Sequence, residues 1–334
     1  MSRDFTILWL QAASCGGCTM SALGAGDRGL VAMLAQYGIR LLWHPSLSEE
    51  GGMQARAMLE AAAAGTAPFD CLCVEGAILR GPGGSGRFQI LGGTGRPMAE
   101  WVRALAAKAA VTVAVGTCAA YGGIPAAGDN PTQATGLQWS GEVGGGLLGR
   151  DWRSPAGLPV VNVAGCAPHP GWVIETLAVL AEGALTESDL DPLGRPLFFA
   201  GRLAHHGCAR NEFYEFKASA EHWSDGGCLM ENLGCKATQA AGDCNLRAWN
   251  GGGSCTNAGY PCVACTSPGF EEPGAPFLET PKLAGIPVGL PLDMPKAWFM
   301  ALAALSKSAT PERVRRNAHA DHVAVPPVWR PRKP

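Results

Sequence analysis

The sequence is poor in charge. Lys, Arg, Asp and Glu make up 16% of its 334 residues, whereas soluble proteins average roughly 25%. The formal net charge is −2, so the chain as a whole does not attract nucleic acid or an anionic membrane. It contains no apolar run near the ~18 residues of a membrane span, and its N-terminus has neither a twin arginine nor a basic region followed by a long apolar one. We therefore expect a cytoplasmic protein with no membrane anchor and no nucleic-acid partner.

The first half of the chain alternates between strand-like and helix-like segments. The strand-like segments are 5–11, 39–44, 69–78, 111–116 and 158–165, and the helix-like ones are 29–37, 54–64, 98–109 and 172–181. This alternation predicts an α/β fold with a doubly wound parallel sheet. Ligands of such sheets bind outside the C-terminal ends of the strands.

After about residue 190 the alternation stops. Residues 205–265 hold seven of the thirteen cysteines, many glycines and few periodic apolar runs. A segment of this kind cannot bury enough apolar surface to fold alone, and it needs cross-links such as disulfides or metal sites. A helix follows at roughly 296–306, and the segment from Pro311 is basic and ends in prolines. We therefore predict a first domain at 1–190, a second at 191–310 and a flexible basic tail at 311–334.

The cysteines are the most informative residues. Their number is odd, so disulfide pairing would leave one over, and in a reducing compartment such a count indicates metal. Cys15 and Cys18 form a CxxC pair just after the first predicted strand, and Cys118 and Cys166 each follow another strand. We therefore expect these four thiols to meet at one edge of the sheet. Four cysteines are the usual ligands of a cubane iron–sulfur cluster, and they would equally suit zinc.

The segment 205–265 offers eight further candidate ligands. They are His205, Cys208, Cys228, Cys235, Cys244, Cys255, Cys262 and Cys265. Eight ligands make two more sites of four, or three sites in all. Only Cys71 and Cys73 are left over, inside an apolar strand where cysteine behaves as a small buried hydrophobe. We favour His205 over His206 because of its i, i+3 spacing to Cys208.

Other candidates carry less weight. The segment 81–86 matches the glycine pattern of dinucleotide-binding loops, but no helix opens directly after its third glycine, which argues against that function. Glu75 ends an apolar strand and could cap, handle protons or serve as a structural carboxylate. His44 and His169 are interpreted as structural.

As a set, the motifs resemble the small, electron-transfer subunit of nickel–iron hydrogenases over nearly the whole chain. The segments that carry the resemblance are CGGC (15–18), VEGAI (74–78), GTCAAYGGI (116–124), NVAGCAPHPGW (162–172), HHGC (205–208), NLGCK (232–236) and YPCVAC (260–265). The resemblance implies a flavodoxin-like domain followed by an irregular cluster-binding domain. It also implies the reaction H₂ ⇌ 2H⁺ + 2e⁻ at a nickel–iron centre in a partner large subunit. This chain would then contain no catalytic residue and would relay electrons through three iron–sulfur clusters.

The resemblance also implies a ligand set for each cluster. The proximal set is Cys15, Cys18, Cys118 and Cys166; the medial set is Cys244, Cys255, Cys262 and Cys265; the distal set is His205, Cys208, Cys228 and Cys235. Cys255 stands where many relatives with a medial [3Fe-4S] cluster have proline, so we predict three [4Fe-4S] clusters. Gly17 and Gly123 stand where oxygen-tolerant relatives carry two extra cysteines, which predicts an ordinary proximal cubane. Ala167 replaces the family's proline after the fourth proximal ligand.

Three further segments resemble the cytoplasmic regulatory, hydrogen-sensing subclass of these enzymes. They are WHPSLS (43–48), LRGPGGSGRF (79–88) and ARNEFYEFKASAE (209–221). That subclass forms a dimer of large–small heterodimers and signals to a histidine kinase. A cytosolic uptake hydrogenase, which would share every ligand, is the alternative, and a non-catalytic zinc-binding scaffold is a more remote one. A one-cluster quinone-reductase subunit is disfavoured, because it would have no use for the seven cysteines of 205–265.

Overall fold

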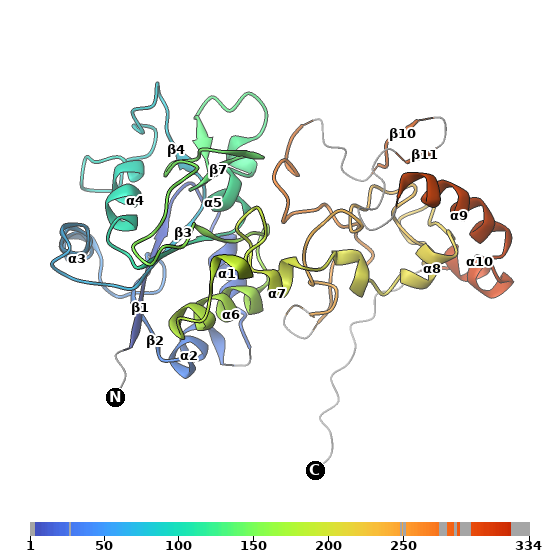
Figure 1. Ribbon diagram of the computed structural model, residues 1–334, viewed down its shortest axis with the longest axis horizontal. Helices are drawn as coiled ribbons and strands as arrows, with labels where there is room; N and C mark the ends of the chain where they lie inside the picture. Colours follow the sequence, from blue (N-terminus) through green and yellow to red (C-terminus); the bar gives the residue numbers. More distant parts are fainter. Residues whose placement is uncertain are drawn as a thin grey trace, which may run out of the picture. The chain divides into compact units, whose positions relative to one another are not determined.

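The computed structural model describes residues 4–26, 28–247, 249, 252–273, 279–283, 286–287 and 295–321. The chain forms two compact units, of which the first comprises Met1–Phe198 and Cys265–Ala275 and the second comprises Phe199–Ala264 and Pro276–Pro334 (Figure 1). This division differs from the expected domains 1–190 and 191–310, because Cys265–Ala275 belong to the first unit. Hydrogen bonds hold them there: Thr117 donates to the carbonyl of Cys265, and Arg195 donates to that of Thr266.

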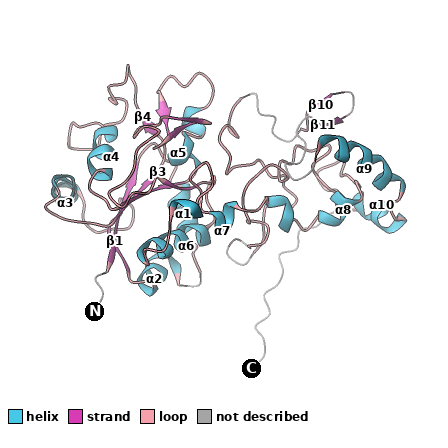
Figure 2. Ribbon diagram, viewed as in Figure 1, coloured by secondary structure: helices cyan, strands magenta, loops and turns pink. Residues whose placement is uncertain are grey.

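Five parallel strands form the central sheet of the first unit (Figure 2). In chain order they are β1 (Phe5–Gln11), β2 (Ile39–Trp43), β3 (Cys71–Glu75), β5 (Val111–Val115) and β9 (Val161–Val163). Their spatial order, β2-β1-β3-β5-β9, is the strand order of flavodoxin-like folds. Every residue of β3 and β5 is buried, as their continuous apolar runs predict for strands covered on both faces. The expected fold class is confirmed.

Helices cover both faces of the sheet. On one face lie α3 (Gly52–Ala64) and α4 (Met98–Ala106), and on the other lie α1 (Gly17–Leu23), α2 (Gly29–Gln36) and α6 (Pro170–Ala181) (Figure 2). Leu8 and Leu72 face α4 and share a buried cluster with Trp101. Cys71 and Cys73 alternate with these side chains and therefore face the opposite side of the sheet. Both are fully buried, as predicted, with their sulfurs 3.8 Å apart.

The remaining elements of the first unit are short. They are β4 (Ile78–Leu79), α5 (Thr117–Tyr121), β6 (Ala134–Thr135), β7 (Trp139–Ser140), β8 (Val143–Gly144) and the 3-10 helices η1 (Ile124–Ala126) and η2 (Glu187–Asp189). The glycine-rich segment 81–86 is a loop, and the next helix begins only at Met98. A dinucleotide site needs a helix N-terminus directly after the third glycine. The loop therefore agrees with the exclusion of that function.

The second unit has little regular structure, as expected. Its elements are η3 (Ala204–Gly207), α8 (Asn211–Glu215), β10 (Lys282–Leu283), β11 (Ile286–Pro287), α9 (Lys296–Ser308) and α10 (Glu312–Ala318), while α7 (Leu197–Ala200) spans the boundary between the units. The helix α10 lies in the segment that we expected to be a flexible tail. Its Val314 is fully buried, and the helix contacts α8, so apolar burial orders the tail as far as Ala318. The rest of the predicted tail, 322–334, lies outside the described residues. None of the described helices is long and apolar enough to cross a bilayer.

Candidate metal centres

Three strands of the sheet deliver the four cysteines of the predicted proximal set to one edge. β1 leads into Cys15 and Cys18, β5 leads into Cys118 at the start of α5, and β9 leads into Cys166. Although β3 separates β1 from β5, the sulfur of Cys18 reaches the end of β5, where a Cβ atom added to Gly116 would overlap it. The structure thus brings the four residues together, as the strand order of the sheet predicts.

Burial and the charges of neighbouring groups favour the neutral thiol at Cys18, Cys118 and Cys166 by raising the pKa of each. Burial raises the pKa of Cys18 above its usual range, and the charges of Glu75 and of the other three cysteines raise it further. Burial also raises the pKa of Cys118 to about 12, with Cys166 adding to the effect. Such thiols ionise when a bound metal supplies compensating positive charge. All thirteen cysteines are free thiols, so this donor set fits an iron–sulfur cluster.

A buried carboxylate at the end of β3 holds the CGGC loop in place. Glu75 is fully buried. It accepts hydrogen bonds from the Ser14 hydroxyl at 2.8 Å, from the backbone N–H of Cys18 at 3.2 Å and from the Thr19 hydroxyl. The sequence identified Glu75 as a candidate for capping or for proton handling, and these contacts make it the acceptor that ties the loop to the sheet. No local pattern could have revealed them, because the partners lie more than fifty positions away in the chain.

His44 extends this network. Its Nε2 lies 3.1 Å from the Thr19 hydroxyl, and its Nδ1 accepts a hydrogen bond from the backbone N–H of Ser46. The side chain is fully buried. Burial lowers the pKa of His44 to about 4, against the opposing effect of Glu75. The imidazole is therefore neutral near pH 7, which agrees with its interpretation as a structural residue.

Two glycines border the proximal cysteines directly. A Cβ atom at Gly17 would stand 3.2 Å from the Cys15 sulfur, and one at Gly123 would stand 2.8 Å from the Cys118 sulfur. These are the two positions at which the resemblance places extra cysteines in oxygen-tolerant relatives. Side chains at these positions would touch the ligand sulfurs. With glycine at both, the proximal set has its four cysteines and no additional thiol from either position.

A pocket in the second unit is lined by all four residues of the predicted distal set, His205, Cys208, Cys228 and Cys235. The His205 ring packs against the Tyr214 ring, with centroids 4.2 Å apart. His205 is buried whereas His206 is exposed, and this difference favours the choice of His205. Burial raises the pKa of Cys228 to about 12, and Cys235 and Cys208 raise it further. This donor set also fits a metal cluster.

Arg210 is a buried cation beside the distal set that the sequence analysis did not single out. Its guanidinium donates hydrogen bonds to three backbone carbonyls, those of Thr256, Asp225 and Gly227. Burial lowers the pKa of Arg210, whereas the three distal cysteines raise it. A guanidinium held at this place offsets the negative charge of thiolates. The only signal in the sequence is the position of Arg210 two residues after Cys208.

The residues of the predicted medial set belong to both units of the chain. Cys244 and Cys262 pack against one small cluster of buried alanines, and Cys255 is exposed. These three residues belong to the second unit, whereas Cys265 belongs to the first. The medial set therefore stays a prediction.

Among the residues that the structure describes, no three His, Cys, Asp or Glu side chains lie close enough together to hold a single metal ion. A tetrahedral zinc site requires its four thiolates about 2.3 Å from one point.

Comparisons with known proteins agree with this arrangement of cysteines. Residues 15–180 match the family model of the NADH ubiquinone oxidoreductase 20 Kd subunit. Residues 200–278, which include all the candidate ligands of the second region, match the model for the C-terminal part of the NiFe/NiFeSe hydrogenase small subunit. The chain is 36% identical to the periplasmic [NiFeSe] hydrogenase small subunit of Desulfomicrobium baculatum, and the match covers 83% of this chain and 87% of that protein. The chain belongs to the family of NiFe and NiFeSe hydrogenase small subunits.

Other members of the family support the same assignment. The F420 non-reducing hydrogenase II small subunit of Methanosarcina mazei is 31% identical, with 93% of this chain and 84% of that protein covered. The solved actinobacterial-type NiFe-hydrogenase from Ralstonia eutropha H16 superposes with a TM-score of 0.74 at 30% identity, with 93% of this chain and 92% of that chain covered. Hydrogenase small subunits bind iron–sulfur clusters and pair with a large subunit that holds the catalytic site. The match over 200–278 also disfavours a one-cluster quinone-reductase subunit.

Proposed function

We propose that this chain relays electrons between the nickel–iron site of its large subunit and an acceptor, as part of a hydrogen-sensing hydrogenase. Two separate groups of ligands support the relay. In the first unit, four thiols follow three strand ends. In the second unit, one imidazole and three thiols line a pocket. Each iron–sulfur cluster, when bound, accepts and gives up single electrons. The chain itself positions the ligands and sets their electrostatic surroundings.

We assign the proximal [4Fe-4S] cluster to Cys15, Cys18, Cys118 and Cys166, and the distal one to His205, Cys208, Cys228 and Cys235. The medial set is assigned to Cys244, Cys255, Cys262 and Cys265 as a third [4Fe-4S] cluster, on the sequence pattern alone. In the distal set, the neutral imidazole of His205 replaces a thiolate and so lowers the negative charge of the site. Together with the buried guanidinium of Arg210, this should raise the reduction potential there.

The sensing role rests on the three segments that resemble the regulatory subclass, 43–48, 79–88 and 209–221. In this proposal the enzyme is cytoplasmic, forms a dimer of large–small heterodimers and passes its signal to a histidine kinase. A cytosolic uptake hydrogenase is the second candidate, because it would use the same ligands for respiration.

The test uses the chain purified anaerobically together with its large subunit. We expect H₂-dependent dye reduction at a low rate, and H₂-dependent association with a histidine kinase encoded nearby. A fully metallated complex without any response to H₂ would contradict the relay. Fast turnover, no kinase association and a growth defect on H₂ after gene deletion would support the uptake role against the sensing role.

A further inference from the structure

Arg210 is a buried cation in the wall of the pocket that the distal ligands form. It is 3% exposed and lines the same pocket as His205, Cys208, Cys228 and Cys235. Its Nη2 atom is buried, and no acceptor for it lies among the residues that the structure describes. A buried N–H group without an acceptor is costly. Its place beside four metal ligands therefore points to an acceptor in the group that they bind.

The other two nitrogens of the guanidinium fix its position. Nη1 donates to the carbonyl of Asp225 at 2.8 Å and to that of Gly227 at 2.7 Å, and Gly227 directly precedes Cys228. Nε donates to the carbonyl of Thr256 at 3.1 Å. Because the guanidinium is planar and rigid, Nη2 cannot turn to another place without breaking these hydrogen bonds. Arg210 thus joins three segments of the chain around the pocket and holds Nη2 in a fixed position.

Electrostatic attraction links the guanidinium to the sulfurs. Burial lowers the pKa of Arg210, and the charges of Cys208, Cys228 and Cys235 oppose this effect. All three sulfurs therefore lie near enough to the guanidinium to attract it. An arginine side chain stays protonated in proteins, so its N–H groups remain donors at any working pH.

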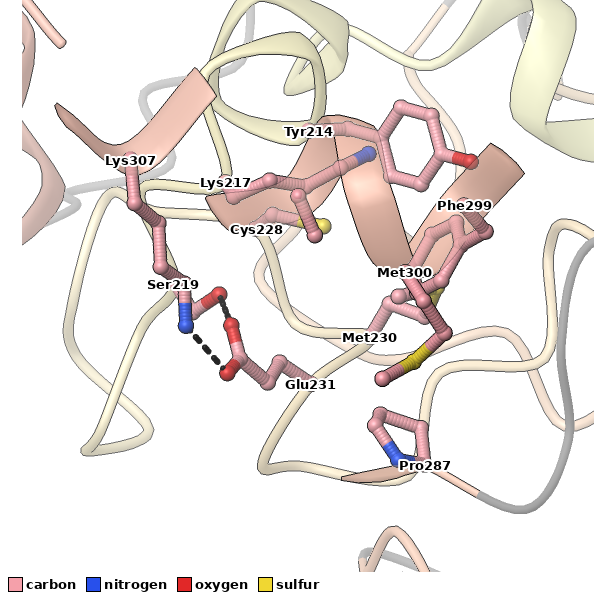
Figure 3. A pocket seen from close by; sticks show the side chains of 11 residues that line it. Tyr214, Lys217, Ser219, Cys228, Met230, Glu231, Pro287, Phe299, Met300 and Lys307 are labelled. Atoms are coloured by element: carbon pink, nitrogen blue, oxygen red, sulfur yellow. Dashed lines mark hydrogen bonds and ion pairs between the residues drawn. The ribbon is translucent and has the colours of Figure 1, made fainter. Parts of the chain in front are cut away.

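A second cation acts on one of the distal ligands from a neighbouring pocket. Figure 3 shows Lys217 in that pocket together with Tyr214 and Cys228. The ammonium group of Lys217 lies 3.6 Å from the centre of the Tyr214 ring. Burial raises the pKa of Cys228, whereas the charge of Lys217 lowers it. Lys217 does not line the pocket of the distal ligands, so the two cations allow charge alone to be compared with charge plus an N–H group inside that pocket.

We propose that Arg210 positions and tunes the distal cluster by donating a hydrogen bond from Nη2 to one of its sulfur atoms. The inference rests on the assignment of a [4Fe-4S] cluster to the distal set in the proposed function, and it adds a specific donor to the effect of the positive charge. Hydrogen bonds to sulfur favour the reduced, more negative state of such a cluster. Arg210 is therefore a positioning residue and takes no part in the cleavage of H₂.

Selective isotope labelling tests this hydrogen bond in the unmodified protein. The complex with the large subunit is prepared with arginine that carries ¹⁵N only in its two Nη atoms. The backbone nitrogen of Arg210, which lies 3.4 Å from the Cys208 sulfur, then remains ¹⁴N. Pulsed EPR spectroscopy of the partly reduced complex detects the nitrogens coupled to the distal cluster, which the coupling of the His205 nitrogen identifies. We expect a second, weaker coupling that changes from ¹⁴N to ¹⁵N with the label. A spectrum that shows the His205 coupling but does not change on labelling would overturn the inference.

Two variants separate the hydrogen bond from the charge. Arg210→Lys keeps a cation but removes Nη2, and Lys217→Gln removes a cation that lies outside the ligand pocket. Arg210→Lys should lower the reduction potential of the distal cluster. It should also release the iron of that cluster to a chelator about tenfold faster or more, because loss of a partner that supports metal ligands commonly weakens metal binding by that factor. Lys217→Gln should keep both its iron and the labelled coupling. An unchanged potential and unchanged iron release in Arg210→Lys would contradict the proposed role.

Dye reduction separates this inference from the relay. An unmodified complex that reduces a dye with H₂ and shows no labelled coupling contradicts the role of Arg210 alone. A fully metallated complex that shows neither dye reduction nor the EPR signal of a histidine-ligated cluster contradicts the relay, and the inference with it.

Discussion

At the scale of single residues, burial determines the charge of His44 and makes stability depend on pH. Burial lowers its pKa to about 4 in the folded chain, whereas an unfolded chain binds the proton near pH 6.5. Between these values the unfolded state holds more protons, so the stabilising contribution is present above pH 6.5 and is lost as the pH falls toward 4. When the pH is lowered from 7 to 5.5, we expect the free energy of unfolding to fall by about 1 kcal/mol.

The variant His44→Gln tests this expectation. Glutamine keeps an amide that can hydrogen-bond to Thr19 but does not titrate. The thermal unfolding of the variant should therefore depend less on pH than that of the unmodified protein over the same range. Circular dichroism under anaerobic conditions, with the clusters loaded, compares the two proteins. The same pH dependence in both would show that other groups are responsible.

A second prediction at this scale concerns the choice between two adjacent histidines. His205 is buried in the ligand pocket and His206 is exposed. His205→Ala should lower H₂-dependent dye reduction by about tenfold or more, as disturbed metal sites commonly do. Isotope exchange between H₂ and deuterated water, which the large subunit catalyses, should persist, because the H–H bond is cleaved there. His206→Ala is the control, and a defect in that variant alone would reverse the assignment.

A third prediction concerns Cys255, the ligand that distinguishes a four-iron from a three-iron medial cluster. Cys255→Pro should remove one iron atom per chain and convert the cluster to [3Fe-4S], which is paramagnetic when oxidised. Iron analysis and EPR spectroscopy of the oxidised protein measure both effects. Cys255→Ala should give the same result without a change in backbone freedom. An unchanged iron content and spectrum in both variants would contradict the medial assignment.

At the scale of elements, the proximal site depends on how closely the ends of β1 and β5 approach. Gly116 follows β5 with φ +91°, and a Cβ atom there would overlap the Cys18 sulfur. Gly116→Ala should therefore displace Cys18 and remove the proximal cluster, with a loss of about four irons per chain. Gly157 has φ +84° and open space around it. Gly157→Ala thus adds comparable backbone strain without the clash and should keep its iron.

At the scale of the whole molecule, twelve ligands should hold three clusters. Anaerobically purified protein should be brown and contain about a dozen irons per chain. A zinc scaffold would be colourless and would contain zinc in place of iron. Metal analysis together with visible absorption distinguishes the two, and a zinc-loaded, colourless complex would overturn the electron relay.

The sequence by itself determined the alternating architecture and the places where cysteines follow strands. Both depend on local patterns: an apolar run such as 69–78 encodes a strand buried on both faces, and a CxxC pair encodes neighbouring thiols. The sequence also predicted the burial of Cys71 and Cys73, since their strand leaves no other position for them.

Only the tertiary structure decided which distant groups meet. The capping of the CGGC loop by Glu75, the contact of Gly116 with Cys18 and the placement of Arg210 beside three cysteines join residues far apart in the chain or in loops without periodicity. The return of residues 265–275 to the first unit and the ordering of α10 by Val314 likewise depend on long-range burial. No local pattern encodes such contacts, because their energies come from surfaces that exist only after the chain has folded.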